Sequence, residues 1–181
     1  DDRFGTEDEL RELLSTAHEN GMNVILDYVA NHLHIDSPVL QAHPDWVTPL
    51  ILPDGRKNLS LWDEQRLTTW FDEHIPTLDT RREEVCDPMT DTALYWVRNF
   101  DFDGYRHDAC KHIPLNYWRM LTHKMKSEMP DRALWQIGET YGDVAVVVAG
   151  NHRGDGCQQS VERERRDDVE SENRLVIGLR G

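Results

Sequence analysis

The order of apolar and polar positions along the chain predicts alternating helices and strands. Between residues 4 and 21, apolar side chains recur at the spacing of one helix face. Thr6 and Glu9 form a capping-box pattern at the start of this segment and Gly21 follows it, so a helix is predicted there. Residues 22–32 begin with consecutive apolar positions and end with polar ones, which is typical of a strand buried on both faces of a parallel sheet.

The same alternation continues in the second half of the chain. A helix is predicted from Asp87, with Pro88 in its first turn. The remaining predicted elements are a strand within residues 102–109, a helix from near Pro114 to before Pro130, and a strand over residues 133–140. Helices alternating with buried strands predict an α/β fold with a parallel sheet, either a barrel or an open doubly wound sheet.

Two segments depart from this alternation. Residues 33–80 are rich in Pro and Trp and contain a predicted hairpin around the turn at residues 53–55. We interpret them as an irregular lobe inserted between a strand and a helix. Residues 143–181 hold a dense run of charges without an amphipathic stripe, which predicts a poorly ordered tail.

Composition narrows the possible partners. With 181 residues and 38% hydrophobic content, the chain can form one domain with a core. Its net charge of −14 argues against a nucleic-acid partner, because binding to phosphates needs clustered Lys and Arg. No apolar run reaches the roughly 18 residues of a membrane span, and three cysteines without metal-like spacing predict free thiols. Because the first residue is Asp, we expect a piece of a longer protein, and the compartment stays open.

Polar side chains gather where each predicted strand ends. Asp27, Asn31 and His32 follow the first strand. The second strand carries or precedes Arg106, Asp108, Lys111 and His112, and the third leads into Glu139. In parallel α/β folds the loops after the strands converge on one opening, so these groups are expected to form one site.

Arg106 and Asp108 are the most informative pair in this set. Side chains alternate along a strand, so the two point to the same face. A guanidinium within a few ångströms lowers the pKa of a carboxyl by roughly 1 to 3 units, which suits an Asp that acts as a nucleophile or a base. The alternatives are a surface salt bridge at Arg106 and a structural role for Asp27, as a buried orienting partner of Arg106.

Four segments together resemble a known family. DYVANH at residues 27–32, GYRHDACKH at residues 104–112 and IGET at residues 137–140 resemble the three successive signatures of the alpha-amylase family of glycoside hydrolases. IPTLD, residues 75–79, is similar to the short motif that this family carries before its second signature. The resemblance covers about residues 4–142.

The resemblance implies a role for each matching residue. Asp108 matches the nucleophile of the family, Arg106 the arginine that keeps it ionised, and Glu139 the general acid and base. The residues that match sugar contacts are His32, Lys111 and His112. Asn31 matches a calcium ligand, and His112 matches a carbonyl donor to the same ion, so calcium is an implied cofactor.

The family's catalytic domain is a (β/α)8 barrel with an irregular lobe after its third strand. By this resemblance the chain is a partial TIM barrel, covering about strands three to five. The expected parts are a barrel helix and strand over residues 1–32, the inserted lobe over residues 33–80, barrel elements over residues 81–142, and the atypical tail over residues 143–181.

The implied activity is cleavage of α-1,4-glucosidic bonds in starch or maltodextrin with retention of configuration. Such a reaction needs two carboxyl groups roughly 5 to 5.5 Å apart, one ionised and one protonated. Trp46, Trp62 and Trp70 in the lobe are either sugar-stacking platforms or plain core residues.

The chain departs from the family pattern at two places. The third essential Asp of the family, in an Asn-His-Asp motif, has no match, and the nearest string is Asn151, His152 and Arg153. We therefore expect the isolated 181-residue chain to be inactive or nearly so. Thr77 occupies a position where many amylases place a calcium-binding Asp.

Other interpretations stay open. Within the same family, a neopullulanase, a cyclomaltodextrinase or a glucan transferase is possible, since most specificity-setting loops fall outside this chain. A non-catalytic glucan-binding relative is another possibility, because a barrel can persist after losing its reactive groups. A divalent-metal hydrolase using the nine histidines is disfavoured, since no His pair has ligand spacing on a predicted helix.

Overall fold

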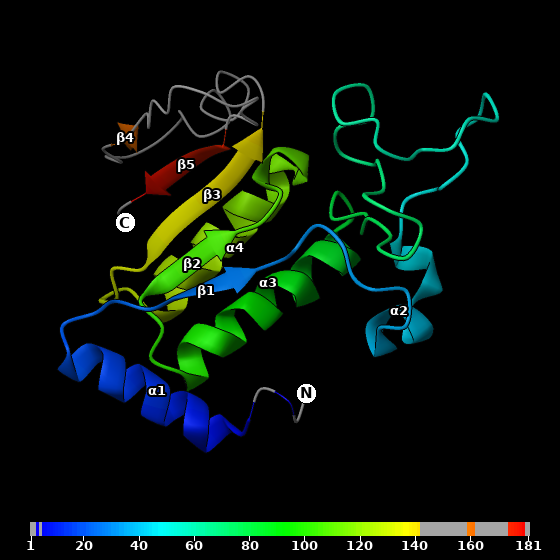
Figure 1. Ribbon diagram of the computed structural model, residues 1–181. Coiled ribbons are helices and arrows are strands. Elements are labelled where there is room, and N and C mark those ends of the chain that lie inside the picture. The colour runs from blue at the N-terminus through cyan, green and yellow to red at the C-terminus, as the bar shows by residue number, and fades with distance from the viewer. Residues whose placement is uncertain (1–2, 4, 142–158, 162–173, 180–181) are drawn as a thin grey trace, which may run out of the picture.

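The computed structural model describes residues 3, 5–141, 159–161 and 174–179 (Figure 1). Its longer helices are α1 (Glu7–Glu19), α3 (Glu83–Asn99) and α4 (Leu115–Glu128), with a short helix α2 (Pro38–Ala42) in the lobe. Its strands are β1 (Ile25–Tyr28), β2 (Gly104–His107), β3 (Trp135–Tyr141), β4 (Gln159–Val161) and β5 (Arg174–Leu179). Short 3-10 helices cover Pro44–Trp46 and Cys110–His112.

The strands form one sheet in the order β1-β2-β3-β5-β4. β1, β2 and β3 run parallel, with Asp27 opposite Arg106 and Arg106 opposite Ile137. α3 lies between β1 and β2 in the chain, and α4 lies between β2 and β3. The predicted α/β fold with a parallel sheet is therefore confirmed for these three strands.

Helices α3 and α4 cover the same face of the parallel sheet (Figure 1). The Tyr28 and Tyr105 hydroxyls donate to the Met89 and Ala93 carbonyls of α3, at 2.7 and 2.8 Å. The ring of His107 meets Trp118 of α4 at a centroid distance of 4.9 Å. Since side chains alternate along each strand, Asp27, Arg106 and Asp108 are left on the opposite, helix-free face.

The core is built mainly from the buried face of α3 and the residues that it meets. Residues with at most 1% exposure include Val85, Cys86, Ala93, Leu94 and Val97 of α3, Leu14 of α1, Tyr105 of β2, and Tyr117 and Leu121 of α4. α1 joins this core at its edge, where the Arg11 guanidinium also lies over the Phe100 ring at 4.5 Å.

The predicted start of α3 at Asp87 is wrong, because the helix begins one turn earlier, at Glu83, and contains Pro88. Proline lacks the N–H that would bond to the carbonyl four residues before it. The cost is offset because the added turn buries Val85 and Cys86 completely. Glu83 and Glu84 also place negative charge at the helix N-terminus, which favours the longer helix.

The prediction that the first strand is buried on both faces is also wrong. In β1 only Tyr28 is buried, while Ile25 and Leu26 are half-buried and Asp27 is exposed. Within the described sheet, β1 is an edge strand, and no helix covers the face that carries Asp27. The apolar run at residues 24–26 was therefore not a sign that both faces of β1 are buried within the described sheet.

The lobe between β1 and α3 holds few regular elements, as predicted. Its hairpin is confirmed: Ile51 bridges Lys57, and the Gly55 amide donates to the Leu52 carbonyl at 2.9 Å. The lobe is tied to β1 because the Leu78 amide donates to the carbonyl of Asn31 at 2.9 Å. The division of the chain into four parts, at residues 1–32, 33–80, 81–142 and 143–181, stays a prediction.

Of the predicted tail, the structure describes only the backbone of β4 and β5. β5 pairs antiparallel with β3, so the parallel pattern ends there. The remainder of the predicted poorly ordered segment lies outside the described residues. Among the helices of the described ranges, none has the length and apolar character that a membrane crossing requires.

Gly104 is expected to be indispensable to the sheet. Its φ is +156°, and a Cβ there would lie 2.1 Å from the Trp135 carbonyl oxygen in β3. We expect Gly104→Ala to lower the free energy of unfolding by about 3 kcal/mol or more, because the backbone of β3 has to move. Gly55→Ala is the control, since its φ is +86° with nothing within 4 Å, and it should cost only about 1 kcal/mol. Equal losses in urea unfolding would contradict this account of Gly104.

A second prediction concerns the pH dependence of stability. His107 is 3% exposed, and burial lowers its pKa to about 4. In the unfolded chain its pKa is about 6.5, so the unfolded state takes up the proton first as the pH falls. Stability is therefore fully present above pH 6.5 and decreases toward pH 4, by about 3 kcal/mol for this group.

The His107→Gln variant isolates this contribution, because glutamine is neutral and keeps an amide near the Gln136 side chain that His107 contacts at 2.6 Å. Urea midpoints at pH 7 and 4.5 should differ less in the variant than in the wild type. Burial also lowers the pKa values of His32 and His112, so part of the slope should remain. An unchanged slope would rule out His107 as its source.

Candidate active site

The candidate site is built around the guanidinium of Arg106 on the helix-free face of the sheet. Arg106 donates from Nη1 to Asp27 Oδ1 at 2.7 Å and to Asp108 Oδ1 at 2.8 Å. Its Nη2 donates to Glu139 Oε2. Burial opposes the positive charge of Arg106, but the hydrogen bonds to Asp27 and Asp108 outweigh it, so its pKa is raised above the ordinary value.

Strand register explains why these four side chains meet. Asp27 and Arg106 are register partners on β1 and β2. Arg106 is also the partner of Ile137 on β3, and Glu139 lies two residues beyond Ile137, on the same face. Asp108, the residue directly after β2, lies two residues beyond Arg106 and so faces the same way. Three parallel strands thus direct their carboxylates to one cation, as expected from the sequence.

The arrangement places Asp108 and Glu139 close to each other. Each accepts from a different nitrogen of one planar guanidinium, so the two bonded oxygens lie within roughly 8 Å. The side chains are 21% and 12% exposed, so both are partly shielded without being sealed from solvent. Two carboxyl groups at this separation can flank one reacting bond.

Asp27 only partly fits the alternative role of a buried partner that orients Arg106. Its contact with Arg106 is present, as expected of an orienting partner. Its side chain is however 64% exposed, so the pair is not buried. A solvated ion pair contributes little to stability, so the hydrogen bond of Asp27 to the guanidinium is not a buried link between the strands.

Lys111 and His112 lie on the 3-10 helix that follows β2 directly. Ala109, with φ +50°, turns the chain into this helix. The Lys111 ammonium pairs with Asp63 of the lobe. His112 donates from Nδ1 to the carbonyl of Arg66 at 2.7 Å, and Arg66 in turn donates to the carbonyl of Lys111.

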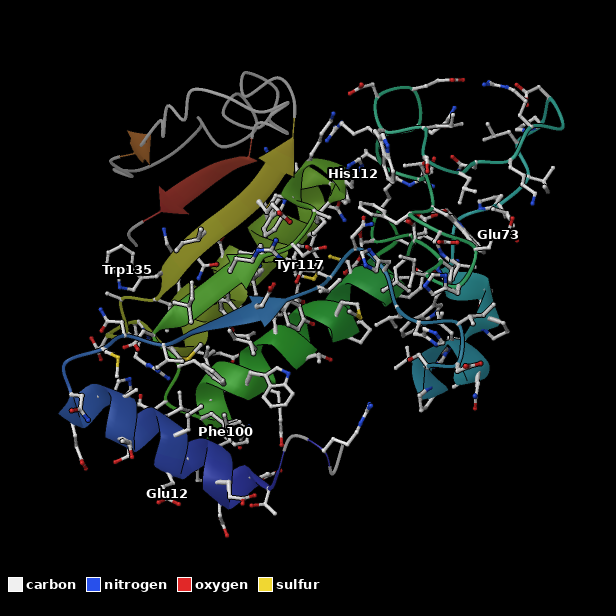
Figure 2. The ribbon with its side chains drawn as sticks, in the orientation of Figure 1. Glu12, Glu73, Phe100, His112, Tyr117 and Trp135 are labelled. Atoms are coloured by element: carbon white, nitrogen blue, oxygen red, sulfur yellow. The ribbon has the colours of Figure 1, made fainter. Side chains whose placement is uncertain are left out.

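Figure 2 shows His112 where the sheet meets the lobe. There an aromatic cluster forms from His32, Trp62, Phe71 and His112. Phe71 is the centre of this cluster, at centroid distances of 4.9 Å from His32, 4.7 Å from Trp62 and 5.0 Å from His112. Burial lowers the pKa of His32, although the negative charge of Asp108 acts in the opposite direction. His32 is therefore within electrostatic range of Asp108.

The predicted site residues thus fall into two connected groups. Arg106, Asp108 and Glu139 are in direct contact, while His32, Lys111 and His112 line the boundary with the lobe. Arg66 and Phe71 also belong to this boundary, although no role was expected for either residue. No sequence signal marks them, because they lie in an irregular segment and reach the site only through folding of the lobe.

Two of the three lobe tryptophans serve packing. Trp70 is 8% exposed and its indole N–H donates to the Thr48 carbonyl at 2.9 Å. Trp46 stacks on His43 at 4.1 Å and packs against the core. Trp62 is 38% exposed, so it alone of the three presents a free ring area next to His112.

The residues expected to bind calcium form an incomplete donor set. Calcium takes six to eight oxygen ligands, several of them carboxylates in tight sites. Asn31 is 1% exposed, and no group of three or more His, Cys, Asp or Glu side chains suited to a metal occurs within the described ranges. Thr77 donates its hydroxyl to the Thr69 carbonyl at 2.6 Å. Calcium binding through Asn31 and His112 therefore stays a prediction, and no step proposed below uses it.

Comparison with known proteins gives a consistent result. The sequence model of the family described as "Alpha amylase, catalytic domain" matches residues 1–45 and 54–156. A maltogenic alpha-amylase of Bacillus acidopullulyticus is 31% identical over 164 residues, covering 83% of this chain and 26% of that protein. A cyclomaltodextrinase of Geobacillus thermopakistaniensis is 29% identical over 160 residues, with the same coverage of 83% and 26%.

Solved structures agree with the sequence matches. The alpha-amylase of Geobacillus thermoleovorans, crystallised with acarbose, superposes with a TM-score of 0.65 at 31% identity, over 78% of this chain and 31% of that one. An Anoxybacillus alpha-amylase gives a TM-score of 0.64 at 31% identity, over 78% and 30%.

The chain spans about a quarter of the length of the curated relatives that it matches. The family match nevertheless covers most of the chain and includes all the candidate site residues. The signatures, the shared guanidinium and the superpositions agree, and the chain belongs to the alpha-amylase family of glycoside hydrolases, as part of its catalytic domain.

Proposed function

We propose that the protein containing this chain is a retaining glycoside hydrolase that cleaves α-1,4-glucosidic bonds in starch or maltodextrin. The observation that carries the proposal is the contact of Asp108 and Glu139 with one guanidinium at the carboxyl ends of neighbouring parallel strands. The fold is proposed to be part of a (β/α)8 barrel. In it, β1, β2 and β3 would be about strands three to five, with the lobe after strand three.

In the proposed first step, Asp108 attacks the anomeric carbon while Glu139 gives a proton to the departing glycosidic oxygen. The bond to the leaving glucan breaks as the bond to Asp108 forms, which leaves a glucosyl ester. In the second step Glu139 takes a proton from a water molecule while the oxygen of that water attacks the same anomeric carbon. The ester bond to Asp108 breaks, and Asp108 is released as a carboxylate. Two inversions give net retention, and the upper bound of roughly 8 Å that the shared guanidinium sets on the separation of the bonded oxygens includes the roughly 5 to 5.5 Å of direct attack.

Arg106 and the residues at the lobe boundary would orient the reactants. The Nη1–Asp108 hydrogen bond engages Oδ1 of that carboxylate and fixes its direction. His32 and Lys111 supply a ring N–H and an ammonium donor that can bond sugar hydroxyls, while neutral His112, whose Nδ1–H donates to the Arg66 carbonyl, can accept from a sugar hydroxyl at Nε2. Trp62 offers an exposed ring face for stacking on a glucose unit.

A second candidate is a cyclomaltodextrinase or maltogenic activity, with neopullulanase or glucan-transferase action in the same group. The names of the related proteins favour this candidate, and the same two acids would perform the chemistry. Product analysis on starch, cyclodextrin and pullulan would separate these activities. A glucan-binding protein without hydrolysis would bind the same sugars and release no reducing ends.

The isolated 181-residue chain is expected to have little or no activity on starch, because it lacks a match to the third essential Asp of the family. A sensitive reducing-sugar assay on the purified chain, with the complete protein as the positive control, checks this. Normal turnover by the isolated chain would show that the third carboxylate is dispensable here.

Substitution of the two acids in the complete protein tests their separate roles. Asp108→Asn should lower kcat by about 10³-fold or more on every substrate, because the amide cannot form the ester. Glu139→Gln should lower kcat on starch similarly but retain more activity on α-glucosyl fluoride, whose leaving group needs little protonation.

Asp27→Asn is the matched control for Asp108→Asn, since Asp27 contacts the same nitrogen of Arg106 but is 64% exposed. We expect it to change kcat by less than about tenfold. If Asp108→Asn behaved like Asp27→Asn, Asp108 would not be the nucleophile.

A further inference from the structure

Gly138, the residue before Glu139, has no space for a side chain while the thiol of Cys110 keeps its position. A Cβ placed on Gly138 would lie 2.7 Å from the sulfur of Cys110 and 3.4 Å from the Cys110 Cβ. The first distance is shorter than any that real Cβ atoms adopt, while the second is a tight but tolerable van der Waals contact. The thiol of Cys110 therefore fills the volume that a side chain on Gly138 would need.

Cys110 is held at this position from several sides. Its Sγ donates to the carbonyl of His107 at 3.3 Å. The backbone N–H of Glu139 faces the same sulfur. Burial is the main reason that the pKa of Cys110 is raised to about 12, so the thiol is neutral at ordinary pH. The side chain acts as a compact neutral wedge between the chain after β2 and the backbone of β3.

The position of this wedge connects the two candidate acids. Cys110 follows Asp108 by two residues, with the turn at Ala109 between them. On the other strand, Gly138 pairs with His107 and precedes Glu139. A change in the side-chain volume between Cys110 and Gly138 would therefore move the backbone of Glu139 relative to that of Asp108.

We propose that Cys110 and Gly138 form a spacer that sets the separation of Asp108 and Glu139, and that both are positioning residues for glycosidic cleavage. The inference rests on the proposed function. A shift of about 1 Å in the position of a reacting group can lower a rate by about 10²-fold. The spacer is thus expected to influence kcat without contacting the substrate.

The experiment compares Gly138→Ala, Cys110→Ala and the double variant in the complete protein. Gly138→Ala should lower kcat on starch by about 10²-fold with a small change in KM, because the new methyl group collides with the sulfur. Cys110→Ala removes the sulfur and should cause a smaller loss. In the double variant the nearest contact becomes the 3.4 Å distance between the two Cβ atoms, so kcat should recover at least tenfold over Gly138→Ala.

Two further readouts separate positioning from loss of folding. Thermal unfolding shows at which temperature every variant is fully folded, and rates are compared below it. Gly138→Ala should also lose less activity on α-glucosyl fluoride than on starch, because displacement of Glu139 mainly impairs protonation of the leaving group. Gly21→Ala serves as the control for a destabilising glycine replacement without a clash, since its φ is +74° and nothing lies within 4 Å of its Cβ position.

The spacer is overturned if folded Gly138→Ala keeps kcat within threefold of the wild type, or if the double variant is as slow as the single one. If Gly138→Ala does not fold, Cys110→Val takes its place, because it adds bulk to the same contact, and an unchanged kcat then overturns the proposal. Failure of the proposed function is a different result, namely a folded wild-type protein without α-glucan cleavage, and it removes the spacer's catalytic role as well.

Discussion

The site depends on one guanidinium that serves three carboxylates. Arg106 donates hydrogen bonds from both terminal nitrogens, to Asp27 on β1, to Asp108 after β2 and to Glu139 on β3. Carboxylates that approach one another repel, and a cation between them makes the approach favourable. The parallel register of β1, β2 and β3 produces this arrangement, because each contributing residue lies on a strand or directly after one and its position is set by strand pairing.

The helices of the described ranges leave that face of the sheet free. The tyrosines of β1 and β2 bond to carbonyls of α3, and both helices that cover the sheet lie on the side away from Arg106. Gly104 lets the start of β2 approach the backbone of β3 at Trp135, and Gly138, in the middle of β3 and opposite the last residue of β2, lets Cys110 approach it. Close approach at both ends of β2 aligns it with β3, and so aligns Asp108, which follows β2, with Glu139.

The sequence was informative where chemistry and local geometry coincide. Alternation along GYRHD was enough to place Arg106 and Asp108 on one face, and the order of helices and strands was enough to predict a parallel sheet. It was not enough for the start of α3, where burial of Val85 and Cys86 outweighs the signal of Pro88, nor for β1, whose apolar run lies at an edge. The contact of Cys110 with Gly138 and those of Arg66 with Lys111 and His112 join segments that are distant in sequence. No local pattern encodes such contacts.

The bonds between Arg66 and the 3-10 helix after β2 have a thermodynamic consequence. The lobe and the proposed sugar-contacting residues share hydrogen bonds, so they form one cooperative unit. Any saccharide that binds Lys111 and His112 in this conformation would also stabilise the folded lobe, by mass action. By reciprocity, replacements deep in the lobe would change saccharide affinity without touching the sugar, so the irregular segment is a route by which specificity can drift while the acids stay fixed.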